Sequence, residues 1–229
     1  MSLSDTTPPD VAAQHSASRG QLWTEFLALF IGVPVLMAVF FEFIQANRLL
    51  FAAVWALAGV AAFLLWRTPG WSFRKLLAGP VLSEWRFVLA FSLLTGVTCT
   101  AFVFAINPDL FLIFPRFRPE LWIFVIIAYP LLSAWPQEVI YRSLFFERYS
   151  SLFPGHWALI IANGAVFGFG HLFYMNWITI SMTAVGGAVM GWAYLRHRSM
   201  PLAWLLHAIA GNVVFTMGLG QFFYSGAVN

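Results

Sequence analysis

The sequence predicts an all-α fold, a polytopic membrane helical bundle of about seven to eight helices. Three observations support this prediction. The 229 residues are 61% hydrophobic and only 9% charged, whereas a soluble domain carries roughly 25% charged residues. Apolar runs recur at about the 20-residue length that a spanning helix needs, and the period-two alternation of membrane strands is absent. A chain of this composition cannot cover itself with polar surface in water.

The N-terminal segment, residues 1–20, is the exception to the apolar composition. It is polar, contains proline and serine, and has no run suited to burial, so we expect a disordered tail. The apolar run that follows is too long for the hydrophobic region of a signal peptide and predicts an uncleaved signal-anchor helix. Residues 21–229 are expected to form a single transmembrane helical domain.

The first three spans are predicted from uninterrupted apolar runs. Leu22–Phe43 follows the tail, Leu49–Trp66 comes next, and Phe87–Ile106 contains the single cysteine, Cys99. A single cysteine forms no internal disulfide, and the sequence places no activating group beside it. We interpret Cys99 as a packing residue.

The fourth span is predicted over Leu121–Trp135 and is short. Pro130 and Pro136 interrupt it, since a proline inside a helix removes a backbone hydrogen bond and kinks or ends the helix. We expect a second helix to continue through the stretch QEVIYRSLFFERY.

The last three spans are predicted over Trp157–Phe173, Trp177–Leu195 and Pro201–Leu219. Gly187 and Gly191 lie four residues apart in the middle one of these, so they share one face of the helix. Small residues at this spacing let membrane helices approach closely. We therefore expect tight helix packing in this half of the chain.

The basic residues predict the orientation of the bundle, because cytoplasmic loops carry an excess of Lys and Arg. With seven spans and an inner N-terminus, nine of the twelve basic residues fall on the inner side. The inner residues are Arg19, Arg67, Arg74, Lys75, Arg86, Arg142, Arg148, Arg196 and Arg198, and the outer ones are Arg48, Arg116 and Arg118. We expect a protein of the bacterial cytoplasmic (inner) membrane with a cytoplasmic N-terminus. No basic run suggests a nucleic-acid partner; the lipid bilayer is the expected environment.

Glu138 is the acidic residue nearest an apolar core, at the start of the stretch QEVIYR. An ionisable group in that setting is costly and indicates a functional site. Arg142 follows four residues later, in the favourable order for a helical ion pair, so a purely structural pair is the alternative. Pro136 suits the first turn of a helix, which places Gln137 and Glu138 together in that turn.

Two histidines, His171 and His207, also lie among apolar residues, and Asn212 follows the second of them. A lone histidine in such a setting is more often a packing residue. Two of them with Glu138 in neighbouring helices favour water chemistry, either as base and oxyanion donors or as metal ligands. Asn163 lies about two turns before His171, and we interpret it as a tie between two helices.

Three motifs in order resemble the CPBP family of intramembrane proteases, also called the CAAX-protease and bacteriocin-processing, or Abi, family, which includes the Rce1-type prenyl proteases. The first motif, Glu-Glu-x-x-x-Arg, corresponds to the stretch from Gln137 to Arg142. The second, Phe-x-x-x-His, corresponds to Phe167 and His171. The third begins at His207. The resemblance covers the region 121–219.

The resemblance implies a glutamate-dependent endopeptidase that cleaves a membrane-embedded or CAAX-like peptide or protein substrate. Glu138 would activate a water held with His171. His207, with Asn212 assisting, would stabilise the oxyanion. Arg142 would hold Glu138 in place. No cofactor is expected, because no His-Glu-x-x-His pattern demands a metal. If a zinc ion were bound, Glu138, His171 and His207 are the residues that would bind it.

Two residues depart from the family pattern. Gln137 stands where the family has the Glu usually assigned to water activation, and glutamine is not a general base. In the implied mechanism Gln137 would hydrogen-bond the water or the substrate backbone, while Glu138 takes over as base. Gly211 occupies the position four residues after His207, and Asn212 is turned from it by about 100°.

Two other functions remain open at this point. Gln137 also fits a non-catalytic membrane scaffold or regulator derived from this protease family. A proton-linked carrier would use buried Glu and His as well, but such carriers are expected to contain inverted repeats with matching broken helices. The sequence has one broken segment without a counterpart, so the carrier ranks last.

Overall fold

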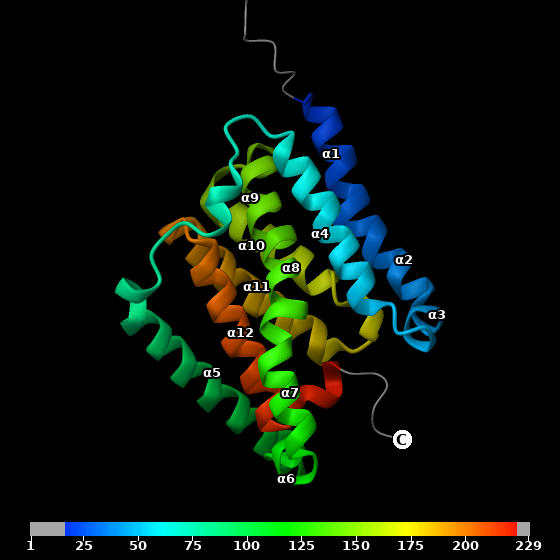
Figure 1. The fold of residues 1–229 in the computed structure, drawn as a ribbon, viewed down its shortest axis with the longest axis vertical. Helices are drawn as coiled ribbons and strands as arrows, with labels where there is room; N and C mark the ends of the chain where they lie inside the picture. The colour runs from blue at the N-terminus through cyan, green and yellow to red at the C-terminus, as the bar shows by residue number, and fades with distance from the viewer. Residues whose placement is uncertain (1–16, 224–229) are drawn as a thin grey trace, which may run out of the picture.

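The computed structural model describes residues 17–223, and in this range the secondary structure is helical throughout (Figure 1). Six helical runs are long and apolar enough to cross a membrane, and Leu50–Trp66 is a shorter apolar helix. The expected all-α membrane bundle is therefore confirmed. The helices are α1 (Arg19–Leu27), α2 (Val33–Val39), α3 (Phe41–Ala46), α4 (Leu50–Trp66), α5 (Trp85–Ile106), α6 (Ile113–Phe117), α7 (Pro119–Tyr129), α8 (Trp135–Glu138), α9 (Phe145–Arg148), α10 (Gly155–Phe169), α11 (Trp177–His197) and α12 (Met200–Met217).

The first helical run begins and ends earlier than expected. Residues 1–16 of the predicted tail lie outside the described residues. Helix α1 begins at Arg19, because the hydroxyl of Ser18 caps it by accepting the backbone N–H of Gln21 at 3.2 Å. The run ends at Val39, and α3 follows as a separate short helix rather than extending the span to Phe43.

The fourth span is one continuous run of 30 residues, Pro119–Arg148, rather than two helices separated by prolines. A π-helical turn begins at Pro130 and absorbs the ring without ending the helix. The indole N–H of Trp204 donates to the carbonyl of Pro130 at 2.7 Å, and that of Trp55 donates to the carbonyl of Leu132 at 3.1 Å. Neighbouring helices thus satisfy carbonyls at the proline turn.

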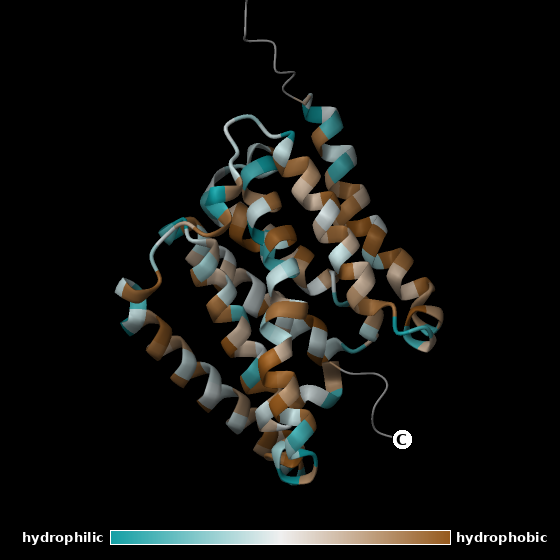
Figure 2. Cartoon of the chain, viewed as in Figure 1, coloured by the Kyte–Doolittle hydropathy of each residue, from teal (hydrophilic) through white to brown (hydrophobic). Residues whose placement is uncertain are grey.

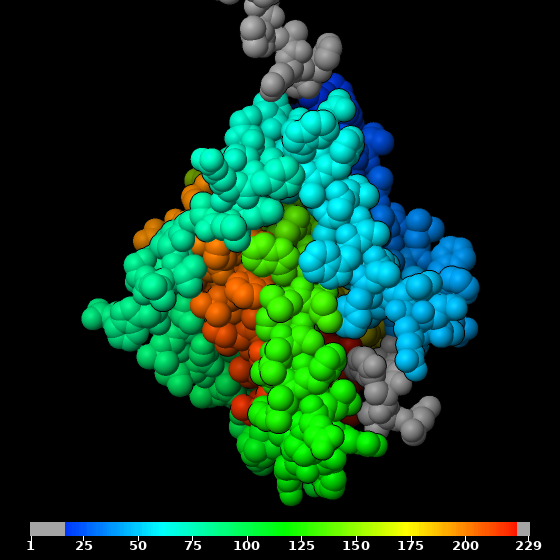
Figure 3. All heavy atoms as spheres, viewed as in Figure 1, coloured from blue at the N-terminus to red at the C-terminus, as the bar shows by residue number. Residues whose placement is uncertain are grey.

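A second π-helical turn, Val139–Leu144, follows directly after Glu138, so the whole QEVIYR stretch is helical, and its residues 138–142 are buried. Figure 3 shows the run from α7 to α9 seated between α4 and α12. This central position buries the charged side chains of Glu138 and Arg142.

Helices α10 and α11 pack tightly, as expected for a glycine-rich pair. A Cβ on Gly164 would lie 2.7 Å from the carbonyl oxygen of Ala184, and one on Gly187 would lie 2.7 Å from the Cβ of Phe167. Neither distance is tolerable for real carbon atoms. The glycines therefore let α10 and α11 approach at van der Waals distance.

The ends of the helices form two layers, with apolar residues between them (Figure 2). The starts of α1, α5 and α10 and the ends of α4, α9 and α11 lie along the upper left side of the molecule in Figure 1. Eight of the nine predicted inner basic residues belong to these ends and their loops; we call this the basic end of the bundle. Arg142 does not belong with them, because its side chain is fully buried in the bundle.

A charged clamp, Glu25 and Arg148, ties the first helix to α9 at the basic end. Arg148 Nε lies 2.7 Å from Glu25 Oε2, and its Nη2 donates to Oε1 at 3.0 Å. Arg148 Nη1 also donates to the hydroxyl of Thr68 at 3.1 Å, just after α4. This two-point contact needs the planar guanidinium fork.

Arg148→Lys is expected to lower the free energy of unfolding by about 1–2 kcal/mol, because a lysine keeps the charge but loses the paired hydrogen bonds. The measurement is the denaturant midpoint of the purified protein in micelles. Arg86→Lys, an exposed residue at the same end, is the matched control. Equal midpoints for the two variants would contradict the role of the clamp.

Candidate active site

Glu138 and Arg142 form a fully buried ion pair inside the long run. Arg142 Nε lies 3.1 Å from Glu138 Oε2, and neither side chain has exposed surface. His207, from α12, donates from Nδ1 to Glu138 Oε1 at 2.8 Å. Both carboxylate oxygens thus have partners of the kind that compensate a buried negative charge.

Asn163 on α10 completes this cluster, in agreement with its predicted role as a tie. Arg142 Nη1 donates to Asn163 Oδ1 at 2.9 Å, and Asn163 Nδ2 donates to the carbonyl of Tyr141 at 2.6 Å. A Cβ on Gly191 would lie 2.6 Å from Asn163 Oδ1, so α11 passes there only because position 191 is glycine. The cluster therefore joins the central run to α10 and α12.

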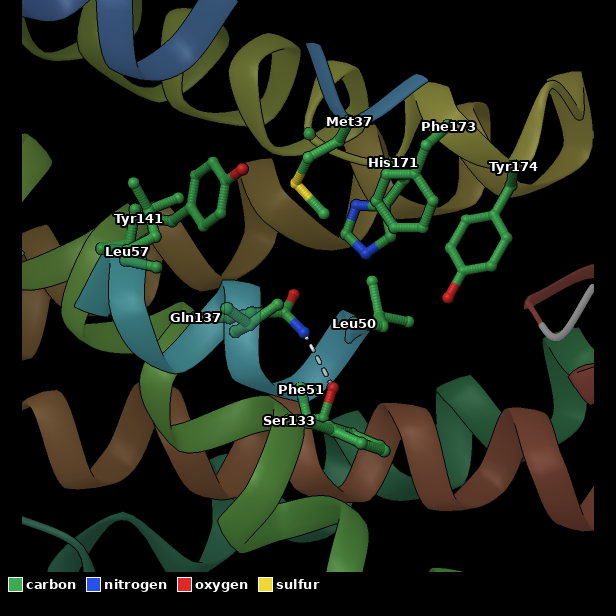
Figure 4. Close-up of a pocket in the computed structure, with 13 residues that line it drawn as sticks. Met37, Leu50, Phe51, Leu57, Ser133, Gln137, Tyr141, His171, Phe173 and Tyr174 are labelled. Atoms are coloured by element: carbon green, nitrogen blue, oxygen red, sulfur yellow. Dashed lines mark hydrogen bonds between the residues drawn. The ribbon is translucent and has the colours of Figure 1, made fainter. Parts of the chain in front are cut away.

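A cavity of about 60 Å³ lies beside this cluster, on the other side of the QEVIYR helix (Figure 4). Its polar lining includes Ser133, Gln137 and His171, while side chains of α2 and α4, among them Met37 and Leu50, supply an apolar wall. This volume is enough for ordered water. Neither Glu138 nor His207 lines the cavity.

Gln137 and His171 face each other across the cavity in Figure 4. The amide nitrogen of Gln137 donates to Ser133 Oγ at 2.9 Å. Its amide oxygen is buried, and no hydrogen-bond partner for it lies in the described residues. An unpartnered buried acceptor at a cavity of this size indicates a water or ligand position.

The hydrogen bond of His171 fixes its tautomer. Nδ1 lies 2.8 Å from the carbonyl oxygen of Phe167, and because a carbonyl only accepts, Nδ1 carries the proton. The neutral ring then has an unprotonated Nε2. The ring therefore offers one basic lone pair at the edge of the cavity.

The Phe167 side chain connects this ring to the buried cluster. The guanidinium carbon of Arg142 lies 4.8 Å from the centre of the Phe167 ring, within the range of a cation–π contact. The rings of His171 and His207 pack edge-on against the same phenyl ring, at 5.0 and 5.4 Å between centroids. The orientation of His171 thus depends on Arg142 through a single intervening residue.

One family comparison gives a match that agrees with this geometry. Residues 119–213 match the family model described as type II CAAX prenyl endopeptidase Rce1-like. This match supports an Rce1-type family member, as the three motifs predicted. Comparisons with curated proteins and with solved structures gave no match. The matched region runs from the start of α7 into α12, so it contains all three motifs and excludes α1 to α6. The match supports a protease in general.

The Rce1-type motif residues separate into three places in the structure. Gln137 and His171 face the cavity, whereas Glu138, Arg142 and His207 lie together behind it. No hydrogen bond or ion pair joins Glu138 to His171 in the part of the chain that the structure describes. The water shared by Glu138 and His171 that the resemblance implied stays a prediction.

Asn212 lies in the third place. It donates to the carbonyl of Ile126 on α7 at 3.2 Å and does not line the cavity. The preceding position, Gly211, lies against Tyr129, whose ring a Cβ there would overlap. Asn212 therefore ties α12 to α7, as expected for a side chain turned from the family position.

Sequence reasoning missed three residues around the site. Tyr129 packs edge-on against His207 at 5.9 Å between centroids and fills the space beside Gly211. Ser133 accepts a hydrogen bond from the amide of Gln137. Because Ser133 lies four residues before Gln137, on the same helix face, the sequence could have predicted this contact. Tyr174 lines the cavity from the turn after α10, and nothing in its local sequence distinguished it.

The residues named for a possible zinc ion do not fit one. Glu138 directs its carboxylate to Arg142 and His207, so its oxygens are engaged away from His171. Among residues 17–223, no group of three or more His, Cys, Asp or Glu side chains is arranged to hold a metal.

Proposed function

We propose that this Rce1-type protein is an intramembrane endopeptidase that hydrolyses a peptide bond of a membrane-associated, CAAX-like substrate with His171 as the general base. The observation that carries the proposal is that the unpartnered amide oxygen of Gln137 and the imidazole of His171, whose Nε2 is free of the proton, line one cavity. A water that donates one hydrogen to each acceptor directs its lone pairs into the cavity. Such a water is positioned as a nucleophile.

The reaction follows from these positions. His171 Nε2 takes a proton from the water as its oxygen attacks the substrate carbonyl carbon, which forms a tetrahedral oxyanion. Gln137 holds the water but accepts no proton. The resulting imidazolium then returns the proton to the leaving amine as the carbon–nitrogen bond breaks. The Phe167 carbonyl, hydrogen-bonded to Nδ1–H, keeps the ring in place throughout and stabilises its protonated form.

Glu138, Arg142 and His207 act in this proposal as positioning residues. Their buried cluster holds Phe167 through the contact of Arg142 with its ring, and Phe167 holds His171. This assignment differs from the one implied by the family resemblance, because Glu138 has no exposed surface and both of its oxygens are engaged.

The basic end supports a membrane orientation for the proposed enzyme. Eight Lys and Arg residues belong to that end, against Arg48, Arg116 and Arg118 at the other. By the positive-inside rule the basic end, with the start of α1, faces the cytoplasm. We propose a bacterial cytoplasmic membrane location on this basis.

Gln137 also favours a second function, a non-catalytic membrane scaffold or regulator that binds such a peptide without cleaving it. The residue that faces His171 carries an amide where a carboxylate would serve as base. In this alternative the cavity and its mouth recognise the substrate, and the buried cluster has a structural role only.

The test is cleavage of a labelled membrane-peptide library by the purified full-length chain, with and without a strong chelator. His171→Ala is expected to lower turnover by at least about 10²-fold, the usual contribution of a general base. His197→Ala, at the basic end, is the matched control and should keep wild-type turnover. Glu138→Gln should lose less than His171→Ala, since an amide oxygen still accepts from His207.

Three outcomes contradict the proposal in different ways. Loss in Glu138→Gln as large as in His171→Ala would assign the base to Glu138. Loss of turnover in the chelator, restored by zinc, would assign the water to a metal. Peptide binding without cleavage by folded wild-type protein would favour the non-catalytic alternative.

A further inference from the structure

A second concave site lies far from the cavity, where α10 begins and α11 ends at the basic end. It is a surface groove of about 340 Å³ lined by His156, Trp157, Ile160, Trp192, Leu195 and Arg196. The motif residues of the proposed enzyme do not take part in it. Its ligand is therefore a separate question from hydrolysis.

The lining changes from charged to apolar with depth, and it does so on both helices. On α11 the order from the end inward is Arg196, Leu195 and Trp192, and on α10 it is His156, Trp157 and Ile160. Four residues of helix correspond to about 6 Å. The groove thus passes from a cation and a histidine to a mixed indole and aliphatic lining over roughly one helical turn.

This gradient matches the chemistry of one class of molecule in a bilayer. Indole rings prefer the headgroup level of a membrane, with their N–H toward water. A basic residue at that level attracts anionic lipid. The indole and aliphatic side chains below the basic residue suit the ester region and the first methylene groups of an acyl chain. A glycerophospholipid presents a phosphate followed by this less polar part.

The charges around the groove favour an anion. No acidic residue lines it, and no ion pair of Arg196 occurs within residues 17–223. Glu84 lies 3.2 Å from His197, and Glu147 lies 2.8 Å from Lys75, so these two acidic residues of the basic end are engaged elsewhere. Trp157 is 72% exposed within residues 17–223, which leaves a large apolar surface uncovered by the described part of the chain.

We propose that this groove binds an anionic phospholipid, with the phosphate at Arg196 and the upper acyl chain between Trp157, Ile160 and Leu195. The occupant is a lipid rather than a free anion, because most of the lining is apolar. Bound there, the lipid bridges the start of α10 and the end of α11.

The test measures lipids retained by the full-length protein. The chain, purified in mild detergent and stripped of lipid, is incubated with equal amounts of phosphatidylglycerol and phosphatidylcholine, and the retained lipids are quantified by mass spectrometry. Wild-type protein is expected to retain phosphatidylglycerol about five-fold over phosphatidylcholine, the preference that one interfacial arginine supports. Arg196→Gln should bring the ratio close to one, and Trp157→Ala should lower the retention of both lipids.

Arg198→Gln removes the same charge two residues away, outside the groove, and should keep the wild-type ratio. An equal fall in the ratio for this control would overturn the proposal in favour of diffuse attraction to the basic end. Displacement of the lipid by millimolar inorganic phosphate would overturn it in favour of a free-anion site. All three variants are compared by size-exclusion profile and helical content, so that a lipid ratio is read only from folded protein.

Discussion

Replacing Gln137 by Glu is expected to raise the rate of peptide hydrolysis by about 10²-fold, the lower range of what a positioned general base contributes. Gln137 faces His171 across the cavity. A carboxylate there would accept the same water and would also take its proton. The substituted side chain would keep a hydrogen bond with Ser133, whose hydroxyl can donate in turn. The measurement is the turnover of a labelled membrane peptide.

This variant separates the two proposed functions. A non-catalytic binder that has lost only its base should gain measurable cleavage, whereas an active enzyme should become faster. Gln221→Glu makes the same charge change on an exposed residue in the short helix after α12 and should leave the rate unchanged. If folded Gln137→Glu protein cleaves no faster than the wild type, Gln137 does not hold the nucleophilic water.

Arg142→Ala is expected to cost about 3–5 kcal/mol of the free energy of unfolding, the usual effect of removing one partner of a buried ion pair. The change leaves Glu138 buried with His207 as its only partner and removes the donor to Asn163. It also removes the cation that packs on Phe167. Denaturant or detergent unfolding of the purified protein, followed by circular dichroism, measures the loss.

A double variant, Glu138→Gln with Arg142→Met, is expected to lose clearly less than Arg142→Ala, because no unpaired charge remains buried. Arg67→Met, at the basic end beyond α4, is the control and should change the midpoint little. A loss for Arg142→Ala no larger than that for Arg67→Met would show that the buried pair carries little of the stability of the bundle.

Both the class of the fold and the identity of most polar cluster members were predictable from local sequence. The lengths of apolar runs determine membrane helices almost independently of their neighbours, because each spanning helix satisfies its own backbone. A Glu and an Arg four residues apart on a helix meet whatever the surroundings. Glu138 and Arg142 therefore paired as expected.

The continuity of the fourth span was not predictable, because neighbouring helices decided it. Two prolines in one segment predict a break, because each leaves the carbonyl four residues earlier without its usual donor. Asn212 donates to the carbonyl of Ile126 and the indole of Trp55 donates to that of Leu132. These donors lie 86 and 77 positions away in the chain. No local pattern reports such a contact.

The sequence by itself determined an all-helical membrane protein, its likeness to an Rce1-type protease and the residues from which its site is built. Only the tertiary structure decided which of them face the cavity. Adjacent helix positions point about 100° apart, so Gln137 and Glu138 direct their side chains to different neighbours. The packing of α4 and α12 against the central run set its rotation, turning Gln137 to the cavity and Glu138 to Arg142 and His207.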